Sequence, residues 1–100
     1  MELKLRFHRR VQADLDEILR KYYEVSHRLG DDFFAEFRIG ISRVVENPRR
    51  FHFDRSGLRR CNLERFPYHF LYDIRGQCIR VWVLRHDRRH SEFGLERFSE

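Results

Sequence analysis

The chain of 100 residues is 41% hydrophobic and 15% aromatic, which predicts one folded domain over residues 1–100 and argues against disorder. No apolar stretch approaches the roughly 20 residues of a membrane-spanning helix, and residues 1–6 contain no apolar signal region, so we expect a cytoplasmic protein without a membrane partner. The formal net charge of +5 favours polyanions or an acidic protein segment as partners, although a surface that only keeps the protein in solution has the same composition.

The first half of the chain predicts one strand and two helices. Residues 3–7 alternate apolar and basic, which is typical of a short half-buried strand. Apolar residues then recur every three or four positions across residues 11–29, which predicts a helix with one buried stripe. We expect the Gly-Asp-Asp at residues 30–32 to end this helix and to cap a second one, which stops at Asn47-Pro48. Two striped helices joined by a tight turn form an antiparallel hairpin that needs a third layer.

The second half of the chain predicts that layer, with residues 49–57 as a loop. Residues 58–65, 66–74 and 78–86 have strand character, and a turn at residues 75–77 joins the last two. The fold class is therefore α+β. It comprises an N-terminal strand and an antiparallel helical hairpin packed on a small antiparallel sheet, in the order β-α-α-β-β-β, with the option of a short helix near residues 92–98.

The last two strands carry apolar residues on both faces, but the hairpin covers only one face. The second face, with Leu71, Trp82 and Leu84, has to be closed by the C-terminal tail or by another chain. Of these two, we favour another chain as the cover of the second face.

The basic charge is concentrated in the sheet half. Residues 11–47 carry five basic and eight acidic side chains, whereas residues 49–65 carry six against two and residues 75–90 carry five against one. Most of the basic residues are arginine, whose planar fork suits phosphate and carboxylate. The net negative charge of the two helices argues against a DNA-binding helix-turn-helix.

A series of short motifs runs through nearly the whole chain: Ala13-Asp14-Leu15-Asp16-Glu17-Ile18, Tyr22-Tyr23, Leu29-Gly30, Asn47-Pro48, Arg59-Arg60, Leu63, Phe66-Pro67-Tyr68, Tyr72, Val83-Leu84-Arg85-His86 and Arg89. In this order and spacing they resemble the RelE/ParE superfamily of bacterial type II toxins, and the ParE side more than the RelE nucleases. The chain departs from the family pattern in two places. His8-Arg9-Arg10 opens the first helix where a Ser or Thr cap and a Pro are usual, and Ser91 and Gly94 stand where a Pro and a Trp are usual near the C-terminus. Arg97 matches the terminal Arg of the pattern.

The resemblance implies a plasmid-stabilisation toxin that arrests growth by binding a target such as DNA gyrase. It also implies a cognate antitoxin that neutralises the toxin in a hetero-oligomer, through an acidic or amphipathic segment lying across the groove or sheet of the toxin. We expect no cofactor.

Basic residues lie on the predicted strand 58–65 and at the end of the predicted strand 78–86. If these strands are neighbours in the sheet, the basic side chains would meet at one rim, and clustered arginines hold phosphates. The residues that we single out for binding target or antitoxin are Arg59, Arg60, Arg65, Tyr68, Trp82, Arg88, Arg89 and Arg97.

The alternative from another class is a ribosome-dependent mRNA endonuclease. Attack by a 2′-hydroxyl needs an acid, a base and cations for the developing charge. His86 is the candidate acid, with Arg60 and Arg89 as stabilisers, whereas no base is evident beyond Glu64, the nearest in sequence. The structural alternative is that His86 closes a strand with its ring hydrogen-bonded to the backbone.

An inactive toxin homologue that serves only as a binding module would explain the altered C-terminal arm. A metal site is not predicted, because His86 and His90 lack a third ligand.

Overall fold

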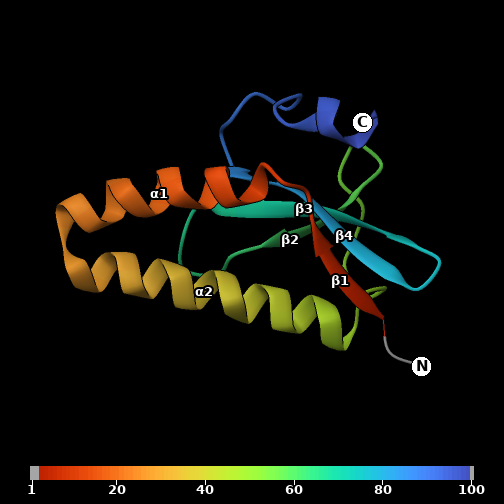
Figure 1. The fold of residues 1–100 in the computed structure, drawn as a ribbon, viewed down its shortest axis with the longest axis horizontal. Helices are drawn as coiled ribbons and strands as arrows, with labels where there is room; N and C mark the ends of the chain where they lie inside the picture. Colours follow the sequence, from red (N-terminus) through yellow and green to blue (C-terminus); the bar gives the residue numbers. More distant parts are fainter. Residues whose placement is uncertain (1–2, 100) are drawn as a thin grey trace.

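The helical hairpin forms as predicted from the spacing of apolar residues. In the computed structural model, which describes residues 3–99, helix α1 (Val11–Val25) and helix α2 (His27–Glu46) run antiparallel on one side of the sheet (Figure 1). Each presents one stripe to the core. The buried apolar residues of these stripes are Val11, Leu15, Ile18, Phe33, Phe37 and Val44. Neither helix is long and apolar enough to cross a membrane.

The turn between the helices lies at Ser26, earlier than the predicted Gly-Asp-Asp. Ser26 is extended, with φ −162° and ψ 149°, and its Oγ accepts the N–H of Leu29 at 3.0 Å. This side chain caps α2, so the prediction that Gly30 ends the first helix was wrong. Gly30 lies inside α2, where a Cβ would overlap the ring of Tyr23 on α1. The glycine is therefore needed for close approach of the helices and not for a turn.

Among residues 3–99 the sheet has four strands, in the order β1-β4-β3-β2. Strands β2 (Arg59–Asn62), β3 (Tyr68–Arg75) and β4 (Cys78–His86) are antiparallel neighbours, as predicted. The N-terminal strand β1 (Lys4–Phe7) adds to the outer edge of β4 and runs parallel to it, which makes the whole sheet mixed. The predicted α+β class and element order are confirmed.

A β-bulge in β4 changes which side chains face the helices. Tyr72 pairs with Val81 and Leu71 pairs with Val83, so Trp82 is an extra residue without a partner on β3. A bulge breaks the strict alternation of a strand. As a result Trp82 and Val83 both face away from the helices, whereas Leu84 packs in the core beneath them. The prediction that Leu84 lies on the second face was wrong for this reason.

The second face is covered by the C-terminal tail of the same chain, so our expectation of a partner there was wrong. The tail ends in a 3-10 helix, η1 (Leu95–Ser99), across the sheet from α2 (Figure 1). Trp82 is only 6% exposed, and its ring stacks on Phe98 with centroids 5.2 Å apart. The tail supplies enough apolar surface to close this face. Its packing residues are Phe93, Leu95 and Phe98, and they cover Leu58, Leu71, Trp82 and Val83.

A buried ion pair holds the tail against the start of α1. The guanidinium of Arg97 donates to the Asp14 carboxylate at 2.7 and 3.0 Å, and also to the carbonyl oxygen of Trp82 at 3.1 Å. The side chains of Arg97 and Asp14 are 5% and 8% exposed. Gly94, with φ +84°, allows the close approach because a Cβ would overlap Val83. The tail is thus an integral layer of the fold.

Candidate functional site

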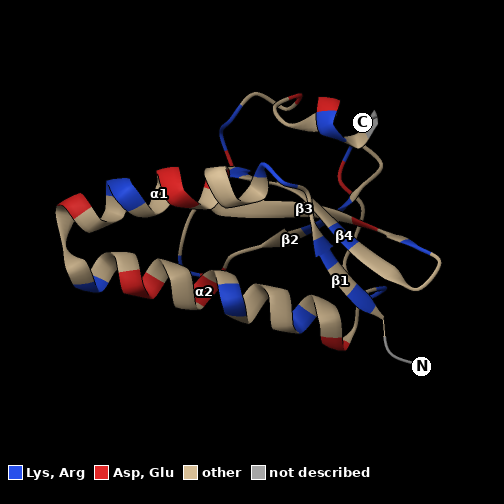
Figure 2. Cartoon of the chain, in the orientation of Figure 1, with Lys and Arg blue, Asp and Glu red and all other residues tan. Residues whose placement is uncertain are grey.

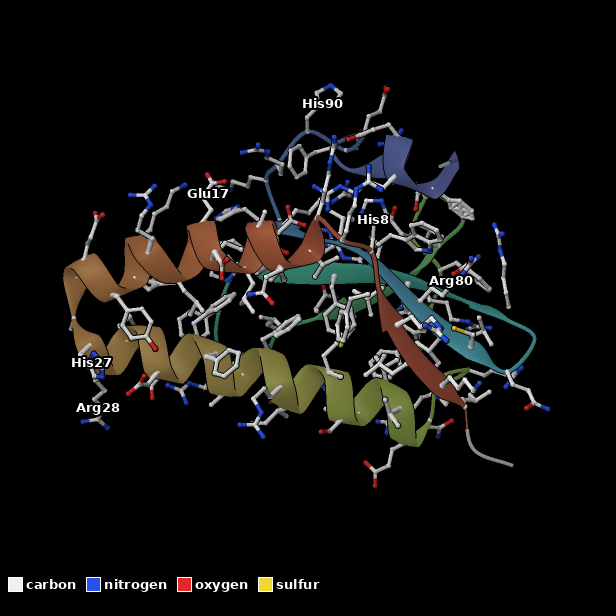
Figure 3. The ribbon with its side chains drawn as sticks, in the orientation of Figure 1. His8, Glu17, His27, Arg28, Arg80 and His90 are labelled. Carbon is white, nitrogen blue, oxygen red and sulfur yellow. The ribbon has the colours of Figure 1, made fainter. Side chains whose placement is uncertain are left out.

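The predicted rim forms where β3 begins and β4 ends. Tyr68 pairs with His86 across these strands, and their rings meet edge to face with centroids 5.0 Å apart. Arg89 follows in the turn after β4, while Glu17 and Lys21 reach the same place from α1. These five residues line a small cleft of about 60 Å³, which we call the rim cleft. Glu17 projects from α1 on the side of the loop that carries His90 (Figure 3).

The rim cleft combines two cations with a carboxylate, a phenol and an imidazole. Burial raises the pKa of Tyr68 to about 12, and the neighbouring Tyr22 adds to the shift, so the phenol stays protonated. Nδ1 of His86 accepts the backbone N–H of Arg88 at 3.0 Å. That contact is the backbone hydrogen bond considered for His86 from sequence, and it leaves Nε2 as the ring atom for any further partner.

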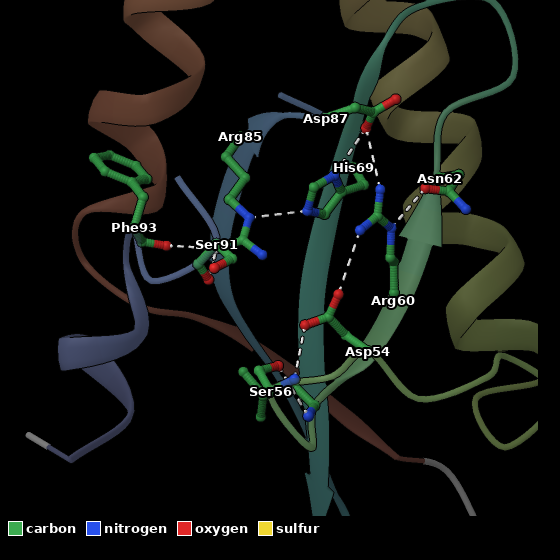
Figure 4. Close-up of polar contacts among 10 residues, drawn as sticks. Asp54, Ser56, Arg60, Asn62, His69, Arg85, Asp87, Ser91 and Phe93 are labelled. Carbon is green, nitrogen blue, oxygen red and sulfur yellow. Dashed lines mark hydrogen bonds and ion pairs between the residues drawn. The ribbon is translucent and has the colours of Figure 1, made fainter. Parts of the chain in front are cut away.

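Beside the rim cleft, a buried histidine joins β3 to the end of β4. Nε2 of His69 accepts a hydrogen bond from Nε of Arg85 at 2.9 Å, and Nδ1 lies 2.8 Å from the Asp87 carboxylate (Figure 4). Since an arginine cannot accept, Nε2 carries no proton and the ring is neutral with its proton on Nδ1. Burial, assisted by the nearby Arg60 and Arg85, lowers the pKa of His69 below its usual value.

Arg60 and Arg85 connect this histidine to the loop before β2 and to the tail. The Arg60 guanidinium lies 3.4 Å from Asp87 and 3.3 Å from Asp54 (Figure 4). Burial disfavours the ionised form of Asp54, but hydrogen bonds from Ser56 and Arg60 outweigh it and lower its pKa.

On the other side, Arg85 donates to the carbonyl oxygens of Ser91 and Phe93 at 2.9 and 2.8 Å. We call Asp54, Arg60, His69, Arg85 and Asp87 the polar network.

Acidification tests the neutral state of His69. Because its folded pKa is lowered, the unfolded chain takes up this proton more readily, and stability is full above about pH 6.5 and falls below it. The slope is at most about 1.4 kcal/mol per pH unit for one proton. Urea unfolding between about pH 7.5 and about pH 5 measures it. The stability that depends on ionised Asp54 is lost only at a lower pH than this range, because the pKa of the Asp54 carboxyl is lowered from 3.8.

The matched control for this pH dependence is His69→Asn, which removes the titrating ring. The variant starts less stable, but its free energy of unfolding should change little over the same pH range. Parallel curves for the wild type and His69→Asn would contradict a neutral buried His69.

The structure brings some of the residues singled out from sequence together and separates others. Tyr68, His86 and Arg89 share the rim cleft, and Arg60 lies in the adjoining polar network. Arg88 is exposed in the turn that follows β4.

The other four lie elsewhere. Arg59 donates to the carbonyl oxygen of Phe51 at 2.6 Å, and Arg65 lies 3.6 Å from Asp32 of α2. Trp82 and Arg97 are buried under the tail.

Sequence reasoning missed three residues at this end of the sheet. Glu17 and Lys21 form an i, i+4 pair on α1 at 3.6 Å, which is also how a solvated helix face looks. His69 was given no role from the sequence, although a histidine in an apolar strand needs buried partners. Within residues 3–99, no three His, Cys, Asp or Glu side chains are arranged to hold a metal ion.

Comparison with known proteins identifies the class. A family model described as the ParE toxin of the type II toxin-antitoxin system, parDE, matches residues 5–90. The chain belongs to the ParE toxin family, which confirms the resemblance seen in the sequence.

A solved structure shares this fold. It is described as "Chromosomal ParDE TA system from P. aeruginosa", and it superimposes with a TM-score of 0.74 at 18% identity. The similarity covers 85% of this chain and 96% of that chain. At this identity the likeness concerns the fold alone. A search among curated proteins finds no match.

Proposed function

We propose that this protein is a growth-arresting toxin that binds DNA gyrase and is neutralised by a cognate antitoxin. The observation that carries the proposal is the match to the ParE toxin family over residues 5–90. Gyrase is the target of characterised ParE-like toxins, and the exposed arginines at the end of β4 suit a target that acts on a polyanion.

Binding is favoured over catalysis because the buried acid and base groups of the polar network are occupied by one another. In the polar network, both ring nitrogens of His69 have partners within 2.9 Å, and the ring is 1% exposed. A buried histidine held between an arginine and an aspartate stabilises the sheet end but cannot reach a substrate. The exposed rim around Arg88 and Arg89 is then a contact surface.

Supercoiling by purified gyrase tests the target. We expect the wild-type protein in excess to inhibit supercoiling, and Arg89→Ala to weaken inhibition by about tenfold, as for an arginine at a contact. Arg28→Ala is the matched control, because Arg28 lies at the hairpin turn, far from the rim (Figure 3). Undiminished supercoiling in the presence of excess protein that arrests growth in cells would reject gyrase.

The rim cleft favours one second candidate, an mRNA endonuclease. It places Glu17, absent from the sequence-based set, beside His86 and Arg89, and so supplies a carboxylate base that the sequence did not reveal. If the protein is a nuclease, induced cells contain cleaved mRNA, and both His86→Ala and Glu17→Gln abolish cleavage. Intact mRNA during growth arrest removes this candidate, and growth arrest itself removes the inactive homologue.

A further inference from the structure

A second cleft opens between the loop that precedes β2 and the C-terminal tail. Phe53 of the loop and Phe98 of η1 both line it, and the two segments lie side by side (Figure 1). The cleft measures about 380 Å³, at the lower end of the range of small-molecule sites. It lies at the end of β3, whereas the rim cleft lies at the start of the same strand. We call it the tail cleft, defined by Arg49, Phe53, Leu58, Arg59, Arg75 and Phe98.

Each aromatic ring of the tail cleft has a guanidinium over it. Cζ of Arg59 lies 4.2 Å from the ring centroid of Phe53. Likewise, Cζ of Arg75 lies 5.2 Å from the ring centroid of Phe98. Phe53 is 61% exposed, so a large apolar ring faces solvent beside a cation. Since Arg59 covers one face of this ring, the other face is open to a planar group.

Arg59 is held in place by the loop and still has donors to offer. Its Nη1 donates to the carbonyl oxygens of Arg49 and Phe51 at 3.1 and 2.6 Å. Both contacts use the same nitrogen, so Nε and Nη2 have no hydrogen-bond partner among residues 3–99. A guanidinium that is already ordered loses little side-chain entropy when it binds an anion.

The tail cleft has an excess of positive charge. Its described lining includes three arginines and one carboxylate, Asp73, which already has three donors. Asp73 accepts the indole N–H of Trp82 at 2.9 Å. It also accepts guanidinium N–H groups of Arg75 and Arg80 at 3.1 and 3.3 Å. The basic positions at this end of the sheet lie in the segment after α2 and in the β3–β4 hairpin (Figure 2). The cleft therefore attracts an anion.

We propose that the tail cleft binds a nucleotide, whose base stacks on Phe53 and whose phosphate is held by Arg49 and Arg75. A bare phosphate would use the arginines and leave the exposed ring uncovered, whereas a nucleotide uses both. The same chemistry is offered by a free nucleotide and by a single strand of nucleic acid. The inference goes beyond the proposed function, because it involves neither gyrase nor an antitoxin.

Titration with a fluorescein-labelled oligothymidylate of about eight nucleotides, followed by fluorescence anisotropy, tests the aromatic part of the site. Phe53→Ala should weaken binding by at least about fivefold, because stacking on a base is lost, whereas Phe53→Trp should bind at least as tightly as the wild type. Phe7→Ala is the matched control. Phe7 is 45% exposed on β1, at the opposite edge of the sheet from β2, and its removal should change affinity less than about twofold.

The dependence of this affinity on salt tests the phosphate contact. Each phosphate contact on a single strand contributes about 0.7 to the slope of log K against log salt concentration. Arg49→Ala should lower that slope by about this amount. Arg28→Ala removes the same charge at the hairpin turn, where the side chain is 92% exposed, and should leave the slope unchanged. Equal slopes for Arg49→Ala and Arg28→Ala would overturn the phosphate contact.

Competition identifies the source of the nucleotide. Displacement of the oligonucleotide by thymidine monophosphate, at concentrations near the Kd of the oligonucleotide, assigns the cleft to a free nucleotide. A complex that resists the monophosphate assigns it to a single strand. Inorganic tripolyphosphate or oligoglutamate that displaces the oligonucleotide as well as an unlabelled copy does would overturn the inference, because such a site recognises charge without a base.

Amide chemical shifts in the complex show which end of the sheet binds. We expect the largest changes at Gly57, Leu58 and Ile74, which line the tail cleft. Largest changes at Arg88 and Arg89 would overturn the inference by moving the ligand to the rim. Full affinity in Phe53→Ala would overturn it as well, as would the absence of binding by both probes up to about 1 mM, which corresponds to about 4 kcal/mol.

Discussion

Replacing Arg97 by alanine is expected to lower the free energy of unfolding by about 3–5 kcal/mol, because it leaves a buried carboxylate without its cation. Asp14 receives both terminal nitrogens of Arg97, and its side chain is 8% exposed. After the substitution the carboxylate keeps the hydrogen bond from the N–H of Leu84, at 3.1 Å, but has lost its cation. Urea unfolding followed by circular dichroism measures the loss.

The matched control for this prediction is an exposed ion pair on α1. Arg20 and Glu24 are 3.0 Å apart, but their side chains are 62% and 66% exposed. Arg20→Ala should therefore change stability by no more than about 0.5 kcal/mol. If Arg97→Ala changes stability as little as Arg20→Ala does, the tail is not an integral layer of the fold.

The sequence predicted the fold where one local signal dominates. Apolar spacing in residues 11–29 and alternation in residues 66–74 each point to one element type, and both elements are present. The hairpin turn was misplaced because two signals competed. Ser26 can cap a helix, and Gly30 can either end one or lie where two helices pack closely. The sequence does not distinguish these two roles of Gly30; the contact with Tyr23 in the structure does.

The candidate site was less predictable because it depends on contacts between distant segments. The bulge at Trp82 reversed the faces of Val83 and Leu84, and no sequence signal marks an extra residue in a strand of continuous apolar character. Glu17 reaches the rim cleft only because α1 crosses the end of β4. Arginine content predicted a cationic rim, but charge alone cannot show that Arg97 would be buried against Asp14.

Trp82 provides the second large effect, because it was singled out for partner binding and lies in the core. Its indole N–H donates to Asp73 at 2.9 Å, and its ring is covered by Phe98. Trp82→Ala should cost about 3–5 kcal/mol, as is usual for truncating a buried aromatic residue. Trp82→Phe keeps most of the ring area and should cost about half as much or less, through the lost hydrogen bond and the smaller ring.

The two roles of Trp82 make opposite predictions for stability and binding. A contact residue would lose affinity for gyrase or antitoxin while the free energy of unfolding stayed unchanged. Replacing a core residue lowers the free energy of unfolding, and the protein that remains folded keeps its affinity for the partner. Phe53→Ala is the control, because Phe53 is 61% exposed and its ring lies against the guanidinium of Arg59. This substitution should cost about 1 kcal/mol or less. Unchanged stability with lost affinity in Trp82→Phe would return this residue to the binding surface and make the tail a cover that the partner displaces.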